Sequence, residues 1–280
     1  MRKIIVCLSI SILSMTAFPQ APFPTGRDID LFMKSKTMVV LEASVFSDFN
    51  IYIKNTIEQK WKITPYEFVN YDEFENLRTD SSYSFLVLTQ TSFERDKASV
   101  YYNFLNLLLG ADVKYLSEMP EFCSMPLSYS QVEEPRYPPK LGLIIDFMQQ
   151  HVRNLAADPG NTLLRNLSYY NKNSNLVKNK MLLVTSGDLA GEVNTPTKIK
   201  ATYPHEFKLV SEEEVIEAIE NMEPNTVIVH KVGPEDTNRT GWCYKILFGT
   251  DDSKLYFFDN HTLSSKRPDG LLERDFRRLR

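Results

Sequence analysis

The sequence predicts an α/β fold of the mixed α+β kind, made of two duplicated β-α-β-α-β-β-β-α units with helices packed on mixed sheets. Two stretches share one local pattern: "TPYEFVNYDEFENL" at Thr64–Leu77 and "YPHEFKLVSEEEVIEAI" at Tyr203–Ile219. Each holds Pro-x-Glu-Phe, a polar helix cap and an acidic helical pattern. The order of strand and helix patterns around them also agrees, so we expect residues 36–157 and 178–280 to superpose.

The first unit begins with a β-branched and apolar run at Thr37–Leu41, which indicates a strand. Ser47 or Asp48 caps the helix predicted at 48–61, whose apolar residues recur every four positions. "KITPYEFV" predicts a second strand, and Asn70 caps a second helix with Glu73 in the capping-box position. Further runs predict a third strand "SYSFLVLTQT", a fourth "SVYYNFLNLLLG" whose leucines also fit a helix, a short "VKYL" strand and an amphipathic helix at 141–155.

The second unit repeats this order from the strand Met181–Val184 onward. "HEFKLV" matches the second strand, Ser211 caps the next helix with Glu214 at the box position, and "TVIVHKV" matches the third strand. "WCYKILFG" and "KLYFFDN" predict a hairpin, and an amphipathic helix at 271–279 closes the unit. Residues 187–202 contain Gly, Pro and Thr where the first unit has its first helix, so we expect a loop there.

The regions outside the units have their own signatures. Residues 1–20 combine Arg2 and Lys3, an apolar run and a small-residue end, which predicts a signal peptide and an exported protein, periplasmic or secreted. That apolar run is too short to span a bilayer, and no later run is long enough, so the processed chain is not expected to be transmembrane. Residues 21–35 form a lead-in and 158–177 a linker. The proline-rich connection 118–139 is expected to be irregular and to lie across the exterior.

The composition excludes several classes of function. The formal net charge is −4, and removing Arg2 and Lys3 makes it more negative, which argues against a nucleic-acid binder. The chain has no Gly-x-Gly, Gly-x-Ser-x-Gly or Cys-x-x-Cys motif, and its four histidines lack metal-site spacing. We therefore predict no catalytic residue, cofactor or metal ligand. Cys123 and Cys243 could pair after export, although two buried thiols are favoured.

Candidate interaction residues are few, and each has an ordinary structural explanation. Glu67 and Glu206 occupy equivalent places in the two units, where solvated strand glutamates are common. The partly negative C-terminus of a helix stabilises basic side chains near it. The candidate surface comprises Glu67, Glu206, Tyr129, Tyr137, Arg277 and Arg278. The sequence favours an exported non-catalytic module for binding or envelope assembly, with a protein partner possible and the oligomeric state open. The alternative is an exported hydrolase whose acidic site forms only in three dimensions.

Overall fold

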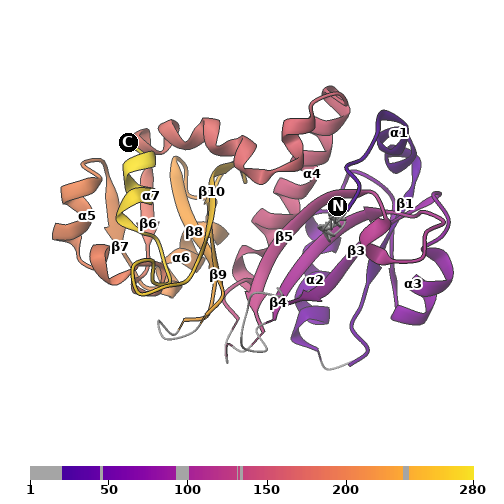
Figure 1. Cartoon of the computed structure of the whole chain (residues 1–280), viewed down its shortest axis with the longest axis horizontal. Helices are drawn as coiled ribbons and strands as arrows, with labels where there is room; N and C mark the ends of the chain where they lie inside the picture. The colour runs from indigo at the N-terminus through magenta and orange to yellow at the C-terminus, as the bar shows by residue number, and fades with distance from the viewer. Residues whose placement is uncertain (1–20, 45–46, 93–100, 131, 133–134, 236–239) are drawn as a thin grey trace, which may run out of the picture.

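Two five-stranded mixed sheets with helices packed on them form the protein, as the computed structural model in Figure 1 shows. The structure describes residues 21–44, 47–92, 101–130, 132, 135–235 and 240–280. The predicted signal peptide therefore lies outside the described residues. One sheet has the strand order β2-β1-β3-β4-β5 and the other β10-β9-β8-β6-β7. Read from its second strand, each unit has the same order, which is consistent with the predicted duplication.

The elements of the first unit follow the predicted sequence of strands and helices. Its strands are β1 (Lys36–Val40), β2 (Tyr66–Val69), β3 (Tyr83–Thr91), β4 (Tyr102–Leu109) and β5 (Glu121–Tyr129). Its helices are α1 (Gly26–Lys34), α2 (Asp48–Lys60), α3 (Tyr71–Leu77), α4 (Leu141–Ala157) and the short 3₁₀ helices η1 (Leu116–Glu118) and η2 (Pro138–Lys140). The predicted capping box at α3 is confirmed, because Asn70 and Glu73 exchange hydrogen bonds of 2.8 and 2.9 Å.

The second unit follows a helical connection made of η3 (Thr162–Arg165) and η4 (Leu167–Asn179). Its strands are β6 (Met181–Val184), β7 (Phe207–Leu209), β8 (Thr226–Val232), β9 (Trp242–Gly249) and β10 (Leu255–Thr262). Its helices are η5 (Ser186–Asp188), η6 (Gly191–Val193), α5 (Pro196–Thr202), α6 (Glu212–Glu220) and α7 (Glu273–Arg278). In each unit the first three strands are parallel to one another and the last two pair antiparallel.

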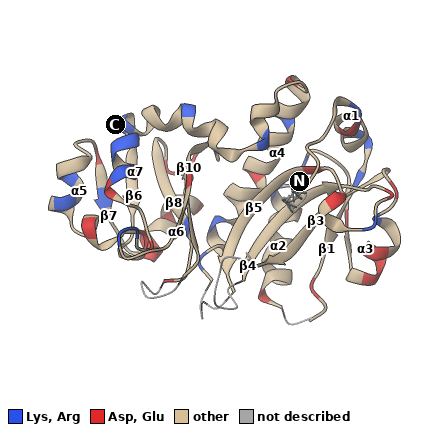
Figure 2. Cartoon of the chain, viewed as in Figure 1, with Lys and Arg blue, Asp and Glu red and all other residues tan. Residues whose placement is uncertain are grey.

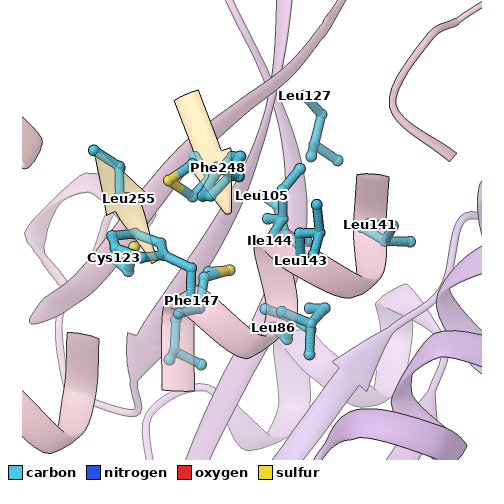
Figure 3. Packing of buried hydrophobic residues seen from close by; sticks show 14 of the residues in the cluster. Leu86, Leu105, Cys123, Leu127, Leu141, Leu143, Ile144, Phe147, Phe248 and Leu255 are labelled. Carbon is cyan, nitrogen blue, oxygen red and sulfur yellow. The ribbon is translucent and has the colours of Figure 1, made fainter. Parts of the chain in front are cut away.

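Helix α4 lies between the two sheets and packs against both (Figure 1). Ten of its side chains are buried, eight of them apolar, so this helix is buried around most of its circumference rather than along one stripe. Ile144 and Phe147 share one apolar core with Leu86 and Leu105 of the first sheet and Phe248 of the second (Figure 3). The rings of Phe147 and Phe248 are 5.8 Å apart between centroids. One continuous core therefore joins the two units.

The outer faces of the sheets have separate cores. Phe74 of α3 packs on the first sheet with Met38 and Phe85. Ile199 of α5 and Phe276 of α7 pack on the second sheet. Among the described residues, a fourth cluster has no helix: Tyr102 and Tyr129 of the first sheet pack with Val232 and Tyr244 of the second.

Three predictions about local structure are wrong. Residues 121–129 of the predicted irregular connection form the buried strand β5, which pairs with β4 along most of its length. Residues 187–202 form η6 and α5 rather than a loop, because Thr195 caps a helix that has Pro196 in its first turn. The "VKYL" run is not a strand, since its last residue begins η1.

Two other findings concern membranes and thiols. Within the ranges given above, no helix combines the length and apolar character needed to cross a bilayer. Cys123 and Cys243 are unpaired and buried, as the sequence favours. Burial raises the pKa of both thiols, so neither is a ready nucleophile.

Candidate functional site

The first candidate site lies at the carboxyl ends of β6 and β8. These strands are neighbours, and their outgoing connections leave toward opposite sides of the sheet, which is where open α/β sheets form ligand crevices. Thr185 and Asp188 follow β6 directly, and Glu212 begins α6. Thr185 donates its backbone N–H and its hydroxyl to Asp188 Oδ2 at 2.8 and 3.0 Å, which fixes the carboxylate. The turn therefore leaves Asp188 Oδ1 available to another partner.

The Arg136 side chain lies at this end of the sheet. Its Nη2 donates to Thr185 Oγ1 at 2.7 Å, to Asp188 Oδ1 at 3.0 Å and to Glu212. A Cβ at Gly187 would lie 3.1 Å from Arg136 Nη1, so the glycine permits the guanidinium to lie against the turn. The two carboxylates that converge here are therefore both engaged by one cation from the connection between β5 and α4.

Lys140 and His230 lie beside Arg136 and are sealed from solvent. Lys140 is 1% exposed, and burial lowers its pKa, with Asp188 opposing that effect. His230 Nε2 donates to the Pro126 carbonyl at 2.9 Å, which assigns the proton to that nitrogen. Burial lowers the pKa of His230 to about 3, and Lys140 adds to the shift. His230 is therefore a neutral residue of β8 whose Nε2 bonds the neighbouring strand β5, while its Nδ1 is buried without a hydrogen-bond partner among the described residues.

The same connection also reaches the first unit. Tyr137 follows Arg136 and is buried, and burial raises its pKa to about 12, with Glu42 and Asp48 adding to the shift. Glu42 follows β1, and its backbone is fixed by Asn50, which accepts from Glu42 N at 2.9 Å and donates to Glu42 O at 2.9 Å. Residues 136–140 therefore contact the carboxyl end of β6 and lie near the charged groups that follow β1.

The second candidate site is a groove of about 490 Å³, which we call the α4–η4 groove. It lies between the second half of α4, the chain that follows it, and the start of β10. Its lining is Phe147, Gln150, Arg153, Asn154, Ala157, Asp158, Asn161, Leu164, Tyr169, Tyr170, Lys172, Asn173, Lys254 and Leu255. The volume falls within the range of small-molecule sites, but polar and charged side chains make up more than half of the lining residues.

Three amides of the groove are held by their nitrogen atoms. Gln150 Nε2 donates to Asp252 O at 2.9 Å, Asn154 Nδ2 to Tyr170 OH at 3.1 Å, and Asn173 Nδ2 to Leu255 O at 3.0 Å. No described residue donates to the three side-chain carbonyl oxygens. The groove therefore offers fixed and unused acceptors to a ligand.

A buried hydrogen-bonded pair, His151 and Tyr170, holds the amide of Asn154 in place. His151 Nδ1 bonds Tyr170 OH at 2.7 Å, and the same hydroxyl receives Asn154. Burial lowers the pKa of His151 to about 4, so its ring is neutral at ordinary pH. The network fixes the position of Asn154 and stays uncharged near neutral pH.

The predicted surface residues do not form one site. Glu67 is exposed on β2 and pairs with Lys36 at 2.5 Å, while Glu206 is exposed before β7, the outer strand of the other sheet. Tyr129 and Tyr137 are buried, so they offer no contact area in this structure. The exposed arginines of α7 are engaged locally, Arg277 by Glu273 at 2.5 Å and Arg278 by Asp259 at 3.0 Å. A binding role for the exposed residues stays a prediction.

Sequence reasoning missed the residues of both candidate sites. Thr185-x-x-Asp188 is a capping signature directly after a strand, which could have marked the turn at β6. The groove has no comparable signal, because its lining comes from a helix, a 3₁₀ connection and a hairpin turn. Across the described ranges, no three His, Cys, Asp or Glu side chains are grouped as metal ligands. Comparison with protein-family models, curated proteins and solved structures finds no match for this chain.

Proposed function

We propose that the protein is an exported, non-catalytic binding module of the cell envelope. The observation that carries this proposal is the pairing of Arg136 with both acidic residues that converge at the carboxyl end of β6. An acid–base pair needs carboxylates that are free to exchange protons with a substrate. Asp188 and Glu212 instead form an internal ion pair with the guanidinium, which supports a structural role for this cluster.

The two histidines near the candidate sites support the same proposal. His151 and His230 are buried, and each bonds an internal partner. The α4–η4 groove, in contrast, is bordered by exposed polar residues such as Arg153 and Asn154. A surface that can bind but has no reactive pair fits a binding module. Export is supported by the amino-terminal pattern of residues 1–20.

The proposal is tested by screening the protein that begins at Ala21 against envelope saccharides, peptides and lipid headgroups. Ligand-observed NMR measures binding, and mass spectrometry after prolonged incubation measures whether each probe survives. We expect at least one probe to bind and to be recovered unchanged. Steady conversion of a bound probe into product would reject the non-catalytic assignment, and recovery of the native protein from the cytoplasm would reject export.

A further inference from the structure

We propose that the α4–η4 groove binds a saccharide that carries a carboxylate. This inference rests on the proposed binding function and adds the site and the chemical class of the ligand. It depends on three features of the groove: unused amide acceptors, cations without a carboxylate partner among the described residues, and a packed aromatic pair in the lining.

The amide acceptors favour a ligand with several hydroxyl groups. The side chains of Gln150 and Asn154 from α4 and of Asn173 from η4 line one groove. Each amide is already oriented by a hydrogen bond that its nitrogen donates, so its oxygen can accept a hydrogen bond from a ligand. Sugar hydroxyls are donors of the required kind, and fixed acceptors bind them without a large loss of side-chain entropy.

The charges of the groove favour an anionic group on that ligand. Arg153 is exposed and has no ion pair with any residue in the described part of the chain. Lys172 lies over the ring of Tyr169, 3.8 Å from its centroid, and also has no carboxylate partner there. Lys254 is 3.2 Å from Asp252, which offsets its charge, and Asp158 is the one acidic residue in the lining. A guanidinium with no partner can bind a carboxylate through two hydrogen bonds.

The local charge of the groove is opposite in sign to the net charge of the protein. The chain carries a formal net charge of −4, whereas Arg153 and Lys172 give the groove a local excess of positive charge. Figure 2 shows basic residues along the chain that joins the two sheets. Two aromatic residues of the lining also pack together, since the ring of Phe147 lies edge-on against that of Tyr170 with centroids 5.1 Å apart.

The test uses digalacturonate as the acidic probe, lactose as a neutral disaccharide and sulfate as a simple anion. Isothermal titration calorimetry measures affinity, and NMR follows the side-chain amide signals of Gln150, Asn154 and Asn173. Arg153→Gln removes the cation and keeps a polar side chain at an exposed position. Lys178→Gln is the matched control, because Lys178 is also exposed and belongs to η4 but does not line the groove.

We expect digalacturonate to bind at least tenfold more tightly than lactose, and Arg153→Gln to remove that difference while Lys178→Gln keeps it. The three amide signals should shift on binding. Equal affinity for both disaccharides, full competition by sulfate, or unchanged binding by Arg153→Gln would overturn the inference. Failure of every probe to bind the unmodified protein would overturn it too. The proposed binding function would then still be tested by the wider ligand screen described above. Cleavage of digalacturonate would instead reject the non-catalytic function.

Discussion

At the scale of single residues, Arg136 shows how one side chain can stabilise a buried carboxylate. The side chain of Asp188 is 2% exposed, and it accepts from Arg136 as well as from Thr185. Glu212 bonds the same guanidinium, but its side chain is 41% exposed. The Arg136–Asp188 pair should contribute more to stability than the Arg136–Glu212 pair. Water screens the exposed pair, whereas it cannot replace the partner of a buried charge.

We expect Arg136→Met to lower the free energy of unfolding by about 3 kcal/mol, because Asp188 loses its cation. Glu212→Gln removes an exposed partner and should cost less than about 1 kcal/mol. Urea denaturation of the three proteins measures both effects. The double variant Arg136→Met/Asp188→Asn should recover part of the loss. Equal effects of the two single variants would contradict the assignment of Asp188 as the buried partner.

His151 and His230 make the stability of the protein depend on pH. Burial lowers the folded pKa of His151 to about 4 and that of His230 to about 3, below the ordinary value of 6.5. The unfolded chain therefore takes up protons first as the pH falls. The stabilisation is complete above pH 6.5 and is lost as the pH falls from 6.5 toward the folded pKa values.

Between pH 7 and pH 5 we expect His151 alone to account for a loss of about 2 kcal/mol. His151→Gln keeps a hydrogen-bonding side chain that does not titrate, so its unfolding free energy should fall less over the same interval. Chemical denaturation at the two pH values gives the comparison. A variant with the same loss as the unmodified protein would show that this ring is not the group responsible.

At the scale of elements, the sequence predicts strands and helices well where apolar periodicity or capping residues are clear. The strands β1, β3 and β4 and the helices α2, α3 and α4 lie where their patterns place them. Strand β5 was missed because Pro126 and several short polar residues interrupt its apolar pattern, although the edge of a sheet tolerates proline. Helix α1 was not predicted, even though Thr25 and Asp28 form a capping box at its start.

Helix α4 is the element with the largest expected effect on stability. Phe147→Ala should lower the free energy of unfolding by about 3 to 5 kcal/mol, because the ring is 1% exposed and its removal leaves a cavity in the shared core. Leu163→Ala is the control, because Leu163 is 69% exposed in η3 and should change stability by less than about 0.5 kcal/mol. Urea denaturation measures both. Similar losses for the two variants would contradict the central position of α4.

At the scale of the whole molecule, the shared core predicts that the units unfold together. The chain offers a probe in each unit, since its two tryptophans are Trp61 and Trp242. We expect the variants Trp61→Phe and Trp242→Phe to report urea transitions of the same steepness by fluorescence and by circular dichroism. Within either variant, a fluorescence transition that precedes the circular dichroism transition would indicate units that unfold separately.

The candidate sites were less predictable than the fold because they depend on contacts between distant segments. Arg136 is 52 residues from Asp188 and 76 from Glu212. No local sequence pattern predicts contacts between residues so far apart. In the α4–η4 groove, Gln150 and Asp252 are 102 residues apart, and their contact depends on how η4 packs beside β10. Periodicity and capping specify elements, whereas these sites follow from the arrangement of both units around α4.

The position of α4 has a consequence for the order in which the protein can mature. Phe248 and Leu255, which help to bury α4, are near the end of the chain and emerge long after it during synthesis. Until they arrive, one side of the helix has no partner, and the amino-terminal unit cannot complete its core. If the chain is exported as we propose, passage through a membrane pore from its amino-terminus would leave this shared core incomplete until the last strands had crossed.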